Sequence, residues 1–152
     1  MIRVLALLRH GLAAGQAPNA ELLPEGAAYL RRLGAMLRAE GWAPAAVLTS
    51  PYDRARTSAV VMIESLGLSR TPQVLDELVP EGEPSDALAA ITAAAPLDSP
   101  VLVVAHLPLL GRLVHELVGD DPSFSPGTFV ELAREGDSHT RLLRRIGPRD
   151  IV

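Results

Sequence analysis

Runs dominated by apolar residues mark the strands of the chain. The clearest are residues 2–8 (IRVLALL), 46–49 (AVLT) and 101–105 (VLVVA), and a short strand is also predicted at residues 73–75. Runs that lack the polar–apolar alternation of a half-exposed strand are typical of a parallel sheet covered on both faces. The sequence therefore predicts that these strands form the buried centre of the molecule.

Segments with helical spacing of apolar residues alternate with these strands. Pro24 and Gly41 flank the first of them in the positions typical of a helix start and end. Ser50 and Pro51 are expected to cap and open the second. The four helices are predicted at residues 24–40, 50–66, 84–95 and 107–118.

The last third of the sequence has a different pattern. Residues 128–133 and 140–146 are predicted to be strands joined by a turn at Glu135, Gly136 and Asp137. Together with the alternating strands and helices, they predict a three-layer α/β/α sandwich, whose sheet is mostly parallel with an antiparallel C-terminal hairpin. A length of 152 residues suits one domain spanning residues 1–152.

Composition excludes several classes of function. Only 3% of the residues are aromatic and the formal net charge is −4, so neither nucleic acid nor an anionic membrane is an expected partner. There is no cysteine, which excludes disulfides and thiolate chemistry, and all 14 basic residues are arginine, which excludes a lysine phosphate loop. The first strand runs directly into Arg9 without a cleavage site, so we expect a cytoplasmic protein.

Cationic and imidazole side chains follow the ends of the predicted strands. Arg9, His10 and Gly11 end the first strand, Arg54 lies just after the second, and His106 follows the strand at residues 101–105. In such sheets, ligands bind beyond the carboxyl ends of the strands. We therefore expect these side chains to meet at one site.

This combination of side chains favours an anionic ligand. Guanidinium groups bind phosphate through paired hydrogen bonds, and a helix N-terminus after His106 adds N–H donors. Neighbouring cations lower the pKa of an imidazole, so His10 is expected to be neutral and nucleophilic, with a carbonyl holding its other ring nitrogen. Gly11 allows a close backbone approach.

Three segments resemble the histidine phosphatase (phosphoglycerate mutase-like) superfamily. They are LLRHG, SPYDRARTSA and VVAHLPLLGRLVHEL, and the short length, with VLDELVPEG and HLPLLGRLV, is most similar to the SixA-type phosphohistidine phosphatases. The resemblance implies that His10 is transiently phosphorylated and that Arg9, Arg54 and His106 form the phosphate pocket. It also implies that no metal or other cofactor is needed.

The chain departs from the family pattern at a few positions. Thr57 stands where the family usually has glutamine, and Leu12 stands where a polar or acidic residue is common. The helix that usually begins Leu-Thr begins here at Leu23 and Pro24, so proline replaces a side-chain cap. These departures concern substrate contacts and helix ends more than the phosphate pocket.

A proton donor decides the substrate class. A phosphoester releases a poor alkoxide leaving group and benefits from a general acid, whereas phosphohistidine releases imidazole and needs less help. Glu77 is the candidate acid at a strand end; otherwise it is a structural carboxylate or a partner for an arginine.

Three functions therefore stay open. The one favoured is a metal-independent phosphatase acting on phosphohistidine in a protein such as a phosphotransfer domain. The alternatives are a phosphatase of a small phosphoester and a phosphate-binding module without turnover. Arg56, His115 and His139 are expected to lie outside the site.

Overall fold

A six-stranded mixed sheet forms the centre of the computed structural model, which describes residues 2–96, 99–136 and 138–151. The strands lie in the order β3-β2-β4-β1-β5-β6. Their bounds are β1 Ile2–Arg9, β2 Ala46–Thr49, β3 Gln73–Val74, β4 Val101–Ala105, β5 Phe129–Glu135 and β6 His139–Ile146. The first four run parallel, whereas β5 pairs antiparallel with both β1 and β6.

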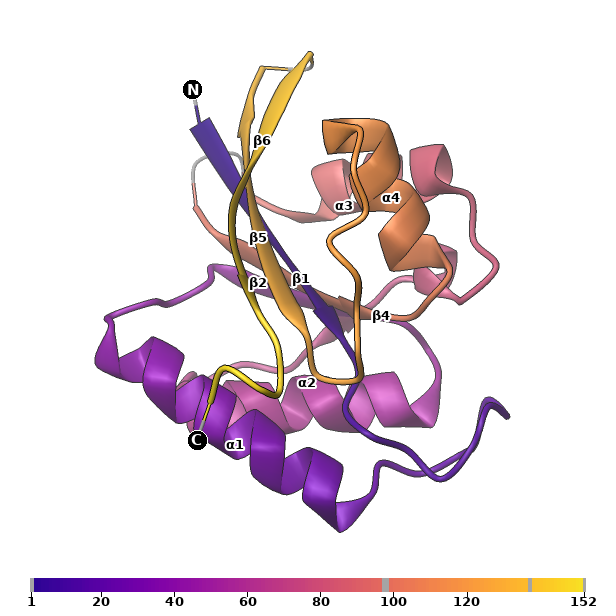
Figure 1. Cartoon of the computed structure of the whole chain (residues 1–152), viewed down its shortest axis with the longest axis vertical. Helices are drawn as coiled ribbons and strands as arrows, with labels where there is room; N and C mark the ends of the chain where they lie inside the picture. The colour runs from indigo at the N-terminus through magenta and orange to yellow at the C-terminus, as the bar shows by residue number, and fades with distance from the viewer. Residues whose placement is uncertain (1, 97–98, 137, 152) are drawn as a thin grey trace.

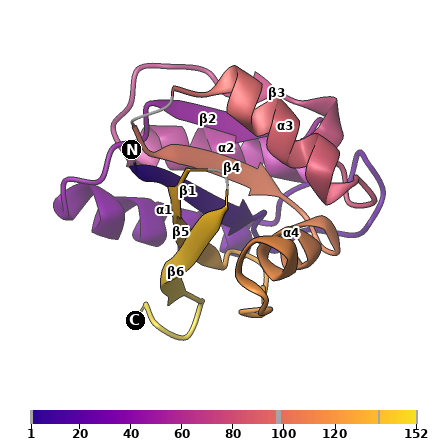
Figure 2. The ribbon, with the colours of Figure 1, turned by 90° about the horizontal axis from the view of Figure 1, so that it is seen from above.

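Helices cover both faces of this sheet. Their bounds are α1 Pro24–Ala39, α2 Asp53–Ser65, α3 Pro84–Ala94 and α4 Leu109–Val118, with a short 3-10 turn, η1, at Asp76–Leu78. Figure 1 shows α1 and α2 together on one side of the strands and α3 and α4 on the other, and Figure 2 shows the same arrangement from above. The predicted α/β/α sandwich with an antiparallel C-terminal hairpin is therefore confirmed.

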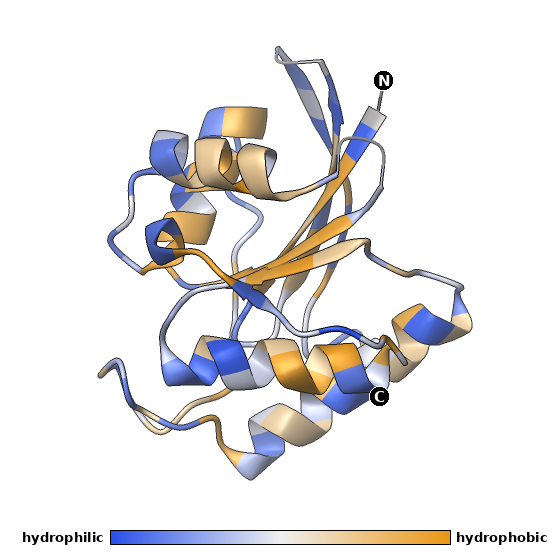
Figure 3. Cartoon of the chain, turned by 180° about the vertical axis from the view of Figure 1, so that it is seen from behind, coloured by the Kyte–Doolittle hydropathy of each residue, from blue (hydrophilic) through white to orange (hydrophobic). Residues whose placement is uncertain are grey.

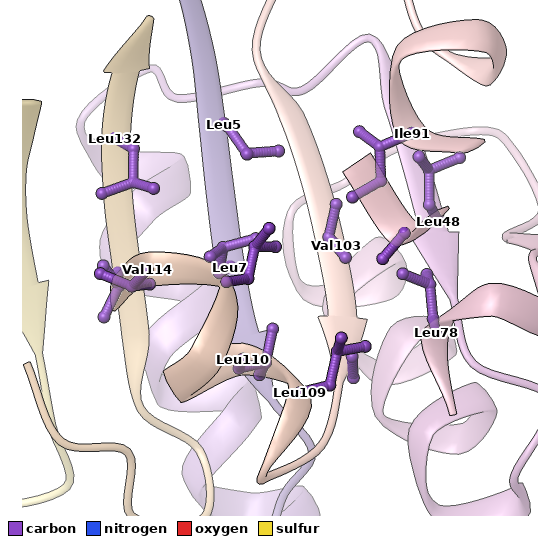
Figure 4. Close-up of a cluster of buried hydrophobic side chains, with 14 of the residues drawn as sticks. Leu5, Leu7, Leu48, Leu78, Ile91, Val103, Leu109, Leu110, Val114 and Leu132 are labelled. Carbon is purple, nitrogen blue, oxygen red and sulfur yellow. The ribbon is translucent and has the colours of Figure 1, made fainter. Parts of the chain in front are cut away.

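The central strands are buried on both faces because their alternate side chains enter two separate cores. Leu5, Leu7 and Val103 point to the core shared with α3 and α4 (Figure 4). Ala6, Leu8 and their counterparts in β4 face α1 and α2. Figure 3 shows the result as strands that are hydrophobic along most of their length, between helices with mixed surfaces. This two-sided burial explains the apolar runs of the sequence.

Helix boundaries follow the proline and glycine signals, with two corrections. α1 begins at Pro24 without a side-chain cap, as expected, and Gly41 follows its end with φ of +81°. α2 begins at Asp53, three residues after Ser50, so Ser50 is not its N-cap. α4 begins at Leu109 rather than at residue 107. In both cases the residues between strand and helix are used by the site at the end of the strands.

The hairpin is longer than predicted. β5 extends to Glu135 and β6 begins at His139, because pairing continues up to the Glu135–His139 pair. The predicted turn includes Asp137, which lies outside the described residues. Within the described residues, no helix is long and apolar enough to cross a bilayer.

Candidate active site

The structure brings Arg9, His10, Arg54 and His106 together at the carboxyl ends of three neighbouring strands. β1 leads into His10, β2 into Arg54 through a short loop, and β4 into His106. The rings of His10 and His106 lie 5.0 Å apart between centroids, and Arg54 Nε is 3.2 Å from His10 Nε2. The predicted convergence of these side chains is therefore what the fold produces.

His10 is held in one tautomer by its surroundings. Its Nδ1 lies 2.7 Å from the carbonyl oxygen of Gly11, and a carbonyl only accepts, so Nδ1 carries the proton. Nε2 is then the unprotonated nitrogen, and it accepts a hydrogen bond from Arg54 Nε. The neutral ring expected from the sequence is the form that these contacts favour.

Burial also keeps both imidazoles neutral. His10 is 7% exposed and His106 is 1% exposed. Burial, with smaller contributions from Arg54 and Arg9, lowers the pKa of His10 to about 4, although the hydrogen bond to Gly11 acts in the opposite direction. Burial and the nearby His10, Arg54 and Arg9 lower the pKa of His106 to about 3. Desolvation is thus a larger cause than the cations named in the sequence argument.

Backbone carbonyls orient the two arginines. Arg9 Nη1 donates to the carbonyl of Phe124 at 2.8 Å, and Arg54 Nη1 donates to the carbonyl of Ala17 at 2.7 Å. Arg54 is only 2% exposed, so it is not a surface partner of Asp53, which pairs with the exposed Arg56. Desolvation lowers the pKa of the half-buried Arg9 and of the buried Arg54.

Two buried polar atoms at the site lack a partner among the described residues. They are Arg9 Nε and His106 Nδ1. His106 Nε2 is 2.7 Å from the hydroxyl of Ser50, which also accepts the N–H of Tyr52 at 3.2 Å. If the hydroxyl donates to Nε2, Nδ1 of His106 carries a proton and becomes a free donor beside the arginines. Unmade hydrogen bonds of this kind are costly in the free protein and suit an anion with several acceptor oxygens.

Sequence reasoning missed Ser58. Its hydroxyl is fully buried, donates to the carbonyl of Arg54 at 2.7 Å and accepts the N–H of Gly11 at 3.0 Å. One hydroxyl therefore ties the helix that carries Arg54 to the loop that carries His10. The available signal was its position four residues after Arg54, one helical turn away on the same face of α2.

The loop before β5 also supports the site and was not foreseen. Gly127 N–H donates to the carbonyls of Arg9 and His10 at 3.1 and 3.0 Å, and Gly127 has φ of +84°. A side chain at Gly127 would collide with the ring of Tyr29. Glycine is therefore required here by both conformation and space.

Other predicted residues lie apart from this cluster. Glu77 is exposed in η1, at the same end of the sheet, and the described residues offer its side chain no hydrogen bond or ion pair. Arg56, His115 and His139 are exposed. Among the described residues, no group of three or more His, Asp or Glu side chains has a geometry that could hold a metal ion.

Two sequence comparisons found known relatives of this chain. The family model described as "Histidine phosphatase superfamily (branch 1)" matches residues 5–80. The phosphohistidine phosphatase SixA of Escherichia coli (strain K12) is 34% identical over 133 residues, which cover 84% of this chain and 80% of that protein.

Solved structures extend the likeness to nearly the whole fold. A structure of the protein histidine phosphatase SixA with tungstate aligns with a TM-score of 0.84 at 26% identity, covering 97% of this chain and 98% of that one. A putative alpha-ribazole-5'-P phosphatase from E. coli K-12 aligns with a TM-score of 0.78 at 19% identity, covering 99% of each chain. At this identity the likeness is one of fold only.

Proposed function

The chain belongs to branch 1 of the histidine phosphatase superfamily and is a phosphatase, and on that premise we propose that it dephosphorylates phosphohistidine in a protein. His10 is the nucleophile of this proposal, and Arg9, Arg54 and His106 hold the phosphoryl group. The observation that carries the proposal is the unprotonated Nε2 of His10. The Nδ1–H bond to the carbonyl of Gly11 holds the ring in this tautomer, and Nε2 faces Arg54.

The reaction follows from the positions of these groups. Nε2 of His10 forms a bond to phosphorus while the bond from phosphorus to the substrate nitrogen breaks, and the released imidazole takes a proton from solvent. Arg54 Nε turns from His10 Nε2 to a phosphoryl oxygen, and Arg9 adds a second positive charge. When the Ser50 hydroxyl donates to His106 Nε2, the neutral His106 adds an Nδ1–H hydrogen bond but no charge. Water then attacks the phosphohistidine of the enzyme, which releases phosphate and restores neutral His10.

Charge compensation in this scheme comes from side chains alone, so the proposal requires no metal. Two guanidinium groups and one imidazole supply donors in a buried, low-dielectric environment, where each hydrogen bond to an anion is strong. Gly11 contributes its carbonyl to the tautomer of His10, and its small size permits the approach of Leu22, at 2.8 Å from where a Cβ would be.

A partner protein that carries phosphohistidine suits this site because imidazole is a good leaving group. Glu77 makes no contact with the four site residues in the described part of the chain, so a proton donor is not already in place. A phosphotransfer domain is the proposed kind of substrate. A small phosphoester is the second candidate, favoured by the position of Glu77 at the same sheet end, one strand from β2.

A paired turnover assay without added metal tests the proposal. One arm uses a phosphohistidine-bearing phosphotransfer protein and the other a panel of small phosphoesters. Each arm is run with wild type, His10→Ala, Glu77→Gln and Glu81→Gln, the last a matched exposed carboxylate. Fast turnover of the protein substrate that is lost in His10→Ala and kept in Glu77→Gln supports the proposal.

Two other outcomes would replace it. Faster turnover of esters that Glu77→Gln abolishes and Glu81→Gln keeps would identify an ester phosphatase with Glu77 as its general acid. Binding of phosphate without turnover in either arm, and without a trapped phosphoenzyme, would leave a phosphate-binding module.

A further inference from the structure

Tyr52 continues a row of rings that begins at the nucleophile. The centroids of His10 and His106 are 5.0 Å apart, and those of His106 and Tyr52 are 4.9 Å apart at an interplanar angle of 59°. The guanidinium carbon of Arg54 lies 5.1 Å from the centroid of the Tyr52 ring. His10 and His106 are buried, whereas Tyr52 is half-buried, so its ring forms the outer end of the row.

The backbone of Tyr52 is fixed by groups of the same site. Its N–H donates to the hydroxyl of Ser50, which also contacts His106 Nε2. Its carbonyl accepts the N–H groups of Ala55 and Arg56 in the first turn of α2. The ring is therefore placed by contacts on both sides of the residue and does not sit on a free loop.

The position of the ring relates it to the departing part of the substrate. In a displacement at phosphorus, the leaving group lies opposite the attacking Nε2 of His10 and on the open side of the phosphoryl group. Tyr52 contacts Arg54 and His106, two of the groups proposed to hold that phosphoryl group, and it is more exposed than either. Its ring consequently lies beside the groups proposed to hold the phosphoryl group and is more exposed to solvent than they are.

An aromatic wall at this place discriminates between leaving groups. An imidazole presents a planar π face that stacks on tyrosine. An amine or alkoxide leaving group has no such face. We propose that Tyr52 is a specificity-determining residue that selects an aromatic nitrogen leaving group, the imidazole of phosphohistidine. This inference rests on the proposed function and deepens it.

Two substrates with the same bond to phosphorus isolate this effect. N-phosphoimidazole and phosphoramidate both carry a P–N bond, but only the first has a ring. We would measure kcat/KM for both with wild type, Tyr52→Phe and Tyr52→Leu. Tyr52→Leu should lower the ratio of kcat/KM for phosphoimidazole over phosphoramidate by about 3- to 10-fold, the range of an aromatic pair. Tyr52→Phe, which keeps the ring, should retain the wild-type ratio.

Each alternative gives a different result. Equal losses on both substrates in Tyr52→Leu would mean that the ring only packs against His106 and would overturn this inference alone. No loss on either substrate would overturn it as well. If wild type does not turn over phosphoimidazole or a phosphohistidine protein, the proposed function fails, and the role of Tyr52 fails with it.

Discussion

The two buried neutral histidines should make the fold sensitive to mild acid. In the folded protein the pKa values of His10 and His106 are about 4 and about 3, whereas the ordinary value is 6.5. As pH falls below 6.5, the unfolded chain takes up a proton on each histidine and the folded chain does not. Protonation therefore stabilises the unfolded state, and the free energy of unfolding falls with pH until the folded histidines also titrate.

The size of this effect follows from the shifts. Between pH 7 and pH 5, each histidine lowers the free energy of unfolding by about 2 kcal/mol, so the pair lowers it by about 4 kcal/mol. This is a large part of the 5–15 kcal/mol typical of a folded protein. Below pH 4 the loss contributed by His10 levels off, because His10 is then protonated in both states.

Urea unfolding followed by circular dichroism at pH 7 and pH 5 measures this loss. The double variant His10→Gln/His106→Gln has no imidazole at either position, so its loss should be smaller than that of wild type by about 4 kcal/mol. His139→Gln, which removes an exposed histidine of β6, is the matched control and should follow wild type. Equal losses in wild type and the double variant would refute the reasoning that desolvation holds these two rings neutral.

Three further predictions concern activity and packing. Ser58→Ala leaves the buried Gly11 N–H without its acceptor, so the free energy of unfolding should fall by about 1–3 kcal/mol. In the same variant kcat should fall more than KM rises, and Ser58→Thr should restore kcat if its hydroxyl reaches both partners. The acid limb of kcat/KM, measured with a substrate that does not titrate between pH 4 and 7, should lie below pH 5, because the pKa of His10 is about 4; a limb near 6.5 would contradict the burial argument. Glu131→Gln should lower the free energy of unfolding by about 1–3 kcal/mol and leave kcat unchanged, because buried Glu131 accepts hydrogen bonds from Trp42 Nε1 and Arg144 Nε. Glu135→Gln is the exposed control, and equal effects of the two variants on the free energy of unfolding would count against the prediction.

Strand positions were predictable because a strand that is buried on both faces is a run of mostly apolar residues. β2 and β4 begin and end at the predicted residues, and the residues after the strands supply the site. Helix starts after β2 and β4 were less predictable, because Ser50 and the residues after His106 have typical helix-start chemistry. Their local preference is overridden by contacts to the site: Ser50 binds His106 and the N–H of Tyr52 instead of capping α2.

The convergence of Arg9, His10, Arg54 and His106 was also predictable, since the carboxyl ends of parallel strands share one edge of a sheet. Their catalytic roles stay predictions. The carbonyls of Ala17 and Phe124 that orient the arginines were not predictable, because every residue has a carbonyl and only the folded chain shows which one an arginine meets. Glu77 illustrates the same limit: its place after β3 is visible in the sequence, but the direction of its side chain is not.

The loop before β5 has a consequence for when the enzyme first becomes active during its synthesis. All four candidate phosphate-binding side chains have been made by residue 106, yet Arg9 waits for the carbonyl of Phe124, and the strand carrying His10 waits for the N–H of Gly127. β5 then enters beside β1 as the antiparallel neighbour. A nascent chain that stops before residue 127 carries all four candidate site residues but lacks the contacts from Phe124 and Gly127 that hold Arg9 and His10. We therefore expect catalytic activity only after the loop before β5 has been made.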